Sequence, residues 1–114
     1  MPIKTESTHA GEFLLSEGNG NISREEITIT SGEVLAVGAV VGKITATGKY
    51  VAYNDAGVAG EEVAAGILYD AVDATDGDTS GVIIARLAEV DASLIVGGDT
   101  AGNTDLNNAL IFLR

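Results

Sequence analysis

Glycines interrupt the central part of the chain, residues 32–74, every few positions. The runs between them are short and rich in valine, isoleucine and threonine, which favours strands over helices. Because glycine tolerates a positive φ angle and a close approach of two backbones, the chain can turn after each short run. This region therefore predicts a small, mainly β domain. The interrupting residues are Gly38, Gly42, Gly48, Gly57, Gly60 and Gly66.

Alternation and apolar runs locate the first strands. Ile27 and Ile29 alternate with threonines, which is the two-residue period of a strand with one buried face. The sequence Asn54-Asp55-Ala56-Gly57 is typical of a turn, because Asn and Asp cap their own backbone and Gly supplies a positive φ angle. Further strands are predicted over residues 34–37, 39–45, 50–53 and 64–72.

The longest predicted strand spans residues 82–90, VIIARLAEV. Both of its faces are largely apolar, which predicts a central place in a sheet. Residues 94–96 predict a short edge strand. Thr104 or Asp105 is expected to cap one helical turn near the C-terminus. Residues 110–113 form either a last strand or a continuation of that helix, because periodicity does not separate the two at this length.

Residues 1–22 are polar and have no sustained periodicity, apart from the triplet Phe13, Leu14 and Leu15. A segment of this composition buries too little apolar surface to offset the entropy lost on ordering. We therefore predict an extended N-terminal arm over residues 1–22, ordered by a partner, and a compact β domain over residues 23–114. Two alternatives stay open: a plain frayed terminus, and a triplet that covers the core of its own subunit.

Acidic residues dominate the chain. Seventeen Asp and Glu stand against six Lys and Arg, for a formal net charge of -11. Nucleic-acid binding needs clustered cations, and here they are scattered singly. The apolar runs are far shorter than the roughly 20 residues of a membrane-spanning helix, and the N-terminus lacks the hydrophobic core of a signal peptide. We expect no nucleic-acid partner, no membrane partner and no secretion by that route.

Motifs for catalysis or metal binding are incomplete. The four aspartates between residues 70 and 78 lack the alternating spacing and final Glu of an EF-hand loop. Neither Lys43 nor Lys49 is followed by the Ser or Thr of a phosphate-binding loop. His9 is the only histidine, there is no cysteine, and no G-x-S-x-G sequence occurs. We therefore expect no enzyme activity, no metal, no cofactor and no small-molecule substrate.

Five consecutive motifs carry a resemblance that spans residues 12 to 91. They are EFLLSEGNGNISRE, VLAVGAVVGK, TGKYVAYN, AAGILYDAVDA and GVIIARLAEVD. In this order they resemble the lambda-type head decoration proteins of tailed bacteriophages, which cement the outside of a DNA-filled capsid. The tail from Ala92 onward is shorter and richer in Gly and Asn than the resemblance leads us to expect.

The resemblance implies a compact fold of the β-clip or small β-barrel type and a structural role. Such proteins form homotrimers on the outer surface of the expanded head, where they staple neighbouring subunits of the major capsid protein. The protein would be made in the cytoplasm of a bacterial host and become part of the virion. An N-terminal arm contacts the capsid, often by adding a strand to it.

The resemblance also places the capsid contacts in the arm. Phe13 is the expected anchor, because buried aromatic side chains dominate interface energetics. The capsid-binding residues implied in this way are Ile3, Thr5, His9, Phe13, Leu14 and Leu15.

A small carrier domain of the lipoyl or biotinyl kind is the alternative function. The sequence GEVLAVGAVVGKI resembles the V-x-x-G-x-x-V rhythm of these acidic, β-rich domains. They present a modified lysine at a hairpin tip inside a recognisable motif, and neither Lys43 nor Lys49 is set in that motif. A lipoyl or biotinyl mass on protein from its native host would favour this alternative.

Overall fold

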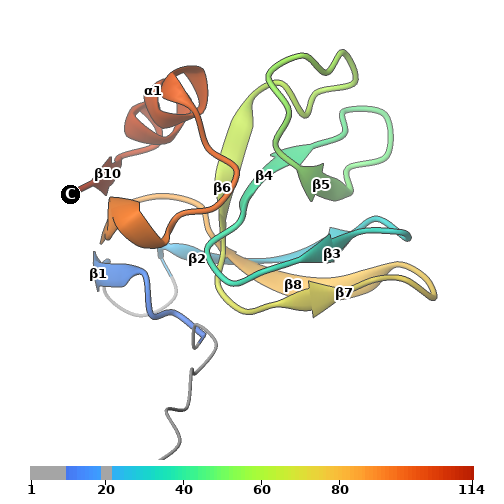
Figure 1. Cartoon of the computed structure of the whole chain (residues 1–114), viewed down its shortest axis with the longest axis horizontal. Helices are drawn as coiled ribbons and strands as arrows, with labels where there is room; N and C mark the ends of the chain where they lie inside the picture. The colour runs from blue at the N-terminus through green and yellow to red at the C-terminus, as the bar shows by residue number, and fades with distance from the viewer. Residues whose placement is uncertain (1–9, 19–21) are drawn as a thin grey trace, which may run out of the picture.

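The computed structural model describes residues 10–18 and 22–114, and its architecture is mainly β with one α-helix near the C-terminus (Figure 1). This confirms the predicted fold class. A 3-10 turn spans Ala92–Leu94 and helix α1 spans Thr100–Asn108. The strands are β1 (Leu14–Glu17), β2 (Arg24–Ile29), β3 (Val34–Leu35), β4 (Val40–Lys43), β5 (Tyr50–Ala52), β6 (Ala64–Leu68), β7 (Val72–Asp73), β8 (Thr79–Ile84), β9 (Ala88–Val90) and β10 (Ile111–Leu113).

Five of the strands close into a barrel in the order β2-β5-β4-β6-β8. Its longest pairing joins β2 and β8 in antiparallel register, from Arg24 opposite Ile84 to Ile29 opposite Thr79. The parallel pairing of β2 with β5 closes the ring at Ile29 and Tyr50. Closure leaves the barrel sheet without a free edge. Strands β3 and β7 form a separate two-stranded ribbon.

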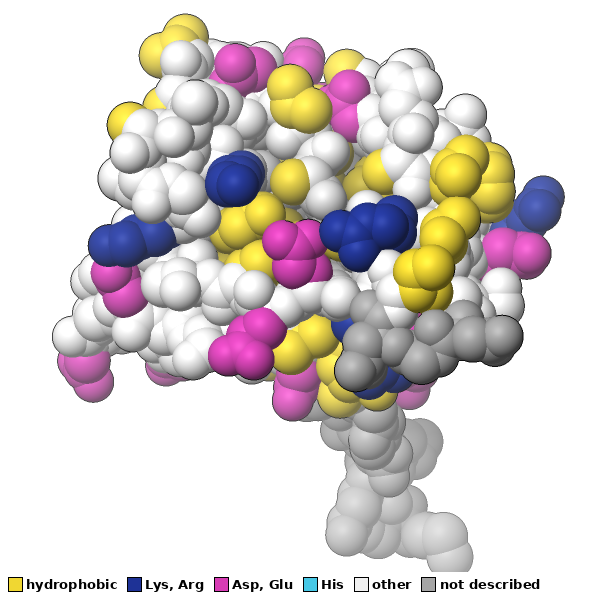
Figure 2. All heavy atoms as spheres, turned by 180° about the vertical axis from the view of Figure 1, so that it is seen from behind, with side chains coloured by type: hydrophobic (Ala, Val, Ile, Leu, Met, Phe, Trp, Pro, Cys, Tyr) yellow, Lys and Arg dark blue, Asp and Glu magenta, His cyan; other side chains and the backbone are white. Residues whose placement is uncertain are grey.

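The basic side chains of the described residues stand singly on the surface, as the sequence predicts, and Figure 2 shows them separated from one another on one face. Most of them are neutralised by carboxylates of the same chain. Such surface pairs are each worth about 0–1 kcal/mol, so they matter here for local charge rather than for stability. The ion pairs are Arg24–Glu17, Lys49–Asp78, Arg86–Glu25 and Arg114–Glu89.

Three barrel strands, β4, β6 and β8, are apolar on both faces and divide their residues between two cores. One core lies inside the barrel, because it draws side chains from all five barrel strands. The other lies outside the barrel wall. Because successive residues of a strand point to opposite faces, neighbours in sequence belong to different cores. The outer and inner members of these neighbouring pairs are Val40 and Val41, Ile67 and Leu68, and Ile84 and Ile83.

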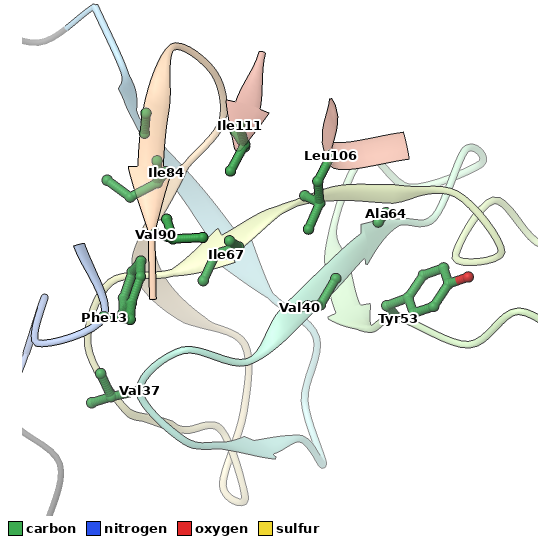
Figure 3. Close-up of a cluster of buried hydrophobic side chains, with 11 residues drawn as sticks. Phe13, Val37, Val40, Tyr53, Ala64, Ile67, Ile84, Val90, Leu106 and Ile111 are labelled. Carbon is green, nitrogen blue, oxygen red and sulfur yellow. The ribbon is translucent and has the colours of Figure 1, made fainter. Parts of the chain in front are cut away.

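The outer core is covered by a second layer, which consists of α1 and the three-stranded sheet β1-β9-β10 (Figure 3). Strand β9 is central, antiparallel to β1 and parallel to β10. Residues 110–113 therefore end in a strand, which resolves the choice that the sequence left open. Val90, Leu106 and Ile111 are fully buried beneath this layer. Burial of each such side chain stabilises the fold by roughly 1.5–3 kcal/mol.

The single strand predicted over residues 82–90 is wrong, because the structure divides it between two sheets. Strand β8 ends at Ile84 and β9 begins at Ala88. Between them Leu87 has a φ angle of 53°, in the left-handed region that residues other than glycine seldom adopt. This bend carries the chain from the barrel to the outer sheet. The two apolar faces of the run reflect the two cores. The expected central place holds for each half, because β8 lies between β6 and β2 in the barrel and β9 lies between β1 and β10.

Two other predicted strands also differ from the structure. The strand predicted over residues 64–72 is divided between β6 and β7. In the edge strand predicted over residues 94–96, only Val96 pairs, through an isolated bridge to Ala39. The preceding residues, Ala92–Leu94, form the 3-10 turn instead. Both differences arise where the chain leaves a sheet, because after β6 it passes from the barrel to the β3–β7 ribbon and after β9 it leaves the outer sheet for the 3-10 turn.

Helix α1 begins before the predicted cap at Thr104 or Asp105. Asp99 is the N-cap: its Oδ1 accepts hydrogen bonds from the Gly102 amide at 2.7 Å and the Tyr53 hydroxyl at 2.8 Å. Asp105 attaches the helix to the barrel, because its Oδ2 accepts a hydrogen bond from the Ala64 amide at 3.0 Å. No helix in the described part of the chain is long and apolar enough to cross a membrane.

Gly38, in the turn before β4, offers a test of this packing. Its φ angle is 84°, and a methyl group added there would meet the Leu94 carbonyl oxygen. We expect Gly38→Ala to lower the free energy of unfolding by roughly 2 kcal/mol or more, because backbone strain and a clash add. Gly77→Ala is the control, since a methyl group placed there meets no atom within 4 Å beyond Gly77 and its two chain neighbours. Equal melting temperatures for the two variants would contradict the packing at Gly38.

The Asp99 cap predicts a pH dependence of stability. Hydrogen bonds from the Gly102 amide and then the Tyr53 hydroxyl hold the pKa of Asp99 below its usual value. This contribution is complete above the unfolded pKa of about 4 and is lost as pH falls through the lower folded pKa. Asp99→Asn should therefore be less stable than wild type at pH 7, with the difference shrinking in acid. Melting temperatures across pH 2–7 measure this, with Asp76→Asn as control, and parallel curves would refute it.

Candidate functional site

The residues predicted to bind a partner fall into two groups. Ile3, Thr5 and His9 lie outside the described residues. Leu14 and Leu15 begin β1 and Phe13 directly precedes it, and the exposure of the three side chains differs sharply. The side chain of Phe13 is fully buried, that of Leu14 packs partly buried against the outer core, and that of Leu15 is 55% exposed. The structure therefore does not present the triplet as one surface.

Phe13 is a core residue of its own subunit. Its side chain belongs to the outer core together with Ile67 and Val90 (Figure 3). Its carbonyl oxygen accepts a hydrogen bond from the Asp91 amide at 2.7 Å. Strand β1 then pairs with β9, with Leu14 opposite Val90. Of the alternatives that the sequence left open for this side chain, the structure shows the one in which it fills the core of its own subunit.

The compact domain consequently begins earlier than the predicted boundary between residues 22 and 23. Residues 10–18 lie on the domain, and β1 is an integral strand of the outer sheet. The physical reason is that Phe13 fills the outer core while β9 satisfies the backbone of β1. Residues 1–9 of the predicted arm lie outside the described residues.

Tyr69 fixes the point at which the chain enters β1. The Gly11 amide donates a hydrogen bond to the Tyr69 carbonyl at 2.8 Å, and its φ angle of 68° brings the backbone against the Tyr69 ring. The Arg24 guanidinium carbon lies 4.3 Å from the centre of the same ring. Arg24 also pairs with Glu17 at 2.8 Å, and this pairing raises the pKa of Arg24 above its usual value. Both ends of β1 are thus held in one orientation.

Ser23 closes the connection from β1 to β2. Its side chain is fully buried, and its Oγ accepts a hydrogen bond from the Gly18 amide at 2.7 Å. The same hydroxyl donates to the Leu87 carbonyl at 2.9 Å. One side chain therefore ties the end of β1 to the bend between β8 and β9.

Of the four aspartates between residues 70 and 78, Asp73 and Asp78 accept hydrogen bonds from both backbone amides and side chains of the same chain. The Thr75 hydroxyl and amide donate hydrogen bonds to Asp73 and lower the pKa of that carboxyl. Asp78 accepts hydrogen bonds from Lys49 Nζ at 2.5 Å and from the Ser31 amide at 2.9 Å, which lowers the pKa of Asp78. Across residues 10–18 and 22–114, no three His, Cys, Asp or Glu side chains are grouped so as to hold a metal ion.

Comparison with protein families decides the relationship of the chain. The family model for the bacteriophage lambda head decoration protein D matches residues 3–110. The chain belongs to this family. No curated protein matches the chain. The family match confirms the resemblance seen in the sequence motifs and extends it beyond residues 12–91 in both directions.

The head decoration proteins are structural proteins of the phage capsid, not a family of enzymes. Membership therefore supports a capsid decoration role and a location in the virion capsid. The carrier alternative gains nothing from the structure. Lys49 lies in the β4–β5 hairpin connection but is held in an ion pair with Asp78, and Lys43 lies in β4 opposite Tyr50, so neither is a free lysine presented at a hairpin tip.

The structure also exposes apolar side chains of this head decoration protein that sequence analysis did not identify. Leu87, Leu110 and Phe112 are 37%, 48% and 39% exposed, and they border one cleft beside the end of β1. We call these three residues the C-terminal apolar patch. Residues 110–113 are all apolar, so the sequence does not show that Ile111 points inward and Phe112 outward. Leu87 and Leu110 gave no signal, because they lie at bends that contain no glycine.

The opposite burial of two neighbouring side chains predicts opposite effects on stability. Phe13→Ala should lower the free energy of unfolding by about 3–5 kcal/mol, because it leaves a cavity in the outer core. Leu15→Ala should change it by less than about 0.5 kcal/mol, because the Leu15 side chain is largely in solvent. Urea denaturation followed by circular dichroism measures both. A Phe13→Ala variant as stable as Leu15→Ala would contradict the core position of Phe13.

Proposed function

We propose that this protein cements the phage head. Three copies assemble on the outer surface of the expanded shell and staple neighbouring subunits of the major capsid protein. The protein is made in the cytoplasm of the bacterial host and joins the shell from outside. The observation that carries the proposal is the family match over residues 3–110, which includes the β domain and most of the segment ahead of it.

Charge agrees with a partner that is protein rather than DNA. The chain has a net charge of -11, which disfavours contact with phosphates. Most of the basic side chains are also engaged with carboxylates of the same subunit. A position on the outside of the shell keeps such a surface away from the packaged genome.

The proposed capsid contact begins ahead of β1. Residues 1–9 bind the major capsid protein by adding a strand to one of its sheets, which gains main-chain hydrogen bonds without a deep pocket. Leu15, exposed on β1, extends this contact. Phe13 and Leu14 support it from within the subunit, because they hold the start of β1 on the outer core.

Multivalency makes such a contact durable. Three arms on one trimer bind at high effective concentration, so weak single contacts add to a tight attachment. Closed symmetry also ends assembly at the trimer and avoids open-ended fibres. A small domain can therefore stabilise a large shell without a large interface of its own.

Cosedimentation with expanded, undecorated shells of the parent phage tests the proposal. Full-length protein should bind saturably, and a variant that lacks residues 1–9 should bind at least about a hundredfold more weakly. Deleting residues 1–9, and no more, keeps β1 and the buried Phe13 in place. An unchanged melting temperature is the control for folding of the shortened chain.

Each other result has a distinct meaning. Equal binding by both versions would retain the decoration role and move the capsid contact onto the β domain. Absence of binding by both, with shells that stay intact, would overturn the proposed function.

A further inference from the structure

The C-terminal apolar patch is an unusual surface for so acidic a chain. Leu87 and Leu110 come from two separate bends, and Phe112 comes from the outward face of β10. They border an open cleft of about 270 Å³. Figure 2 shows hydrophobic side chains gathered on the side of the molecule where the C-terminus lies. Exposed apolar residues that cluster in this way mark interaction sites more often than isolated ones do.

Backbone conformation sets the two leucines apart. Leu87 and Leu110 have φ angles of 53° and 63°, and no other described residue except glycine has a positive φ angle. A residue with a side chain pays of order 1–3 kcal/mol in this region when the surroundings impose it. Glycine or asparagine would fit both bends at lower cost. Two strained positions thus expose a large apolar side chain to the same cleft, which indicates a use for those side chains.

The charges around the cleft are balanced within the subunit. Glu17, which borders the cleft, pairs with Arg24 at 2.8 Å. Glu89, which also borders it, pairs with Arg114 at 3.4 Å, and Arg114 lies over the Phe112 ring at 5.9 Å. A chain with a net charge of -11 repels a second copy of itself over most of its surface. At this cleft the two bordering carboxylates are each paired with an arginine of the same chain, so repulsion between copies is weaker there.

We propose that the C-terminal apolar patch is the surface through which copies of this chain contact one another, with the patches of neighbouring copies meeting at a common axis. The inference identifies the surface between subunits of the proposed trimer, and it rests on the proposed function. Burial of apolar side chains drives the contact. The ion pairs of Glu17 and Glu89 at the edge of the cleft reduce the charge repulsion that opposes it. Because each copy contributes only three exposed apolar side chains, one pairwise contact is weak, and closure of the ring combines several.

A double variant separates association from folding. The double variant Leu87→Asn and Leu110→Asn places asparagine, which tolerates a positive φ angle, at both bends. The monomer should therefore melt at the same temperature as wild type or higher. Self-association, measured by sedimentation equilibrium, should weaken at least tenfold. Val58→Asn is the matched control, because Val58 is a 94% exposed valine away from the cleft. Where the wild-type chain self-associates in solution, unchanged self-association in the double variant would overturn the inference.

Cross-linking on the shell gives a second, independent readout. The chain has no cysteine, so Leu110→Cys introduces a single thiol at the patch and Val58→Cys a single thiol elsewhere. On decorated shells, a short bis-maleimide should join Leu110→Cys subunits to one another and leave Val58→Cys subunits unjoined. This cross-link between Leu110→Cys subunits supports the inference even if the protein is monomeric in free solution and associates only on the shell.

The outcomes distinguish this inference from the proposed function. Shells decorated by Leu110→Cys without cross-links would overturn the patch contact and leave the decoration role intact. A double variant that self-associates normally but loses shell binding would show that the capsid protein covers the patch, which also overturns the inference. If no version binds shells, the proposed function fails, and sedimentation equilibrium alone decides whether copies meet at the patch.

Discussion

Two-sided burial of strands β4, β6 and β8 is the constraint on which the rest of the structure depends. Neighbouring residues such as Val40 and Val41 belong to different cores, one outside and one inside the barrel. The chain has two Phe and no Trp, so both cores are built mainly from aliphatic side chains shared along the same strands. A barrel alone would leave the outer half of these strands in water. The layer of α1 and sheet β1-β9-β10 is therefore required by the barrel.

That outer layer joins the two ends of the described chain. Strand β9 pairs with β1 on one side and with β10 on the other, and Phe13 is buried beneath the same sheet. Contacts made ahead of β1 are thus transmitted to the core through paired backbone and a buried aromatic ring. If the capsid contact lies ahead of β1, as proposed, it acts on the whole domain through this sheet.

Much of the fold class, but only part of the candidate site, was predictable from the sequence. Short apolar runs between glycines indicated a mainly β domain, and ordered motifs indicated the family that the comparison confirmed. The side chains of Phe13 and Leu15 are similarly apolar, yet one is buried and the other exposed. Hydrophobic burial has no preferred direction, so composition does not say whether such a residue covers its own core or a partner. The sequence did not predict the bends at Leu87 and Leu110, because neither bend contains a glycine.

Local patterns indicate most of the short strands and turns, because side-chain alternation and allowed φ and ψ angles act between near neighbours. Long-range packing specifies where these strands go. The run over residues 82–90 breaks at Leu87 because closing the barrel and covering its outer face demand that the chain leave one sheet for the other. The same demand places β1 and β10 beside β9. No residue within the run carries that information, since the energy that favours the break comes from contacts distant in the chain.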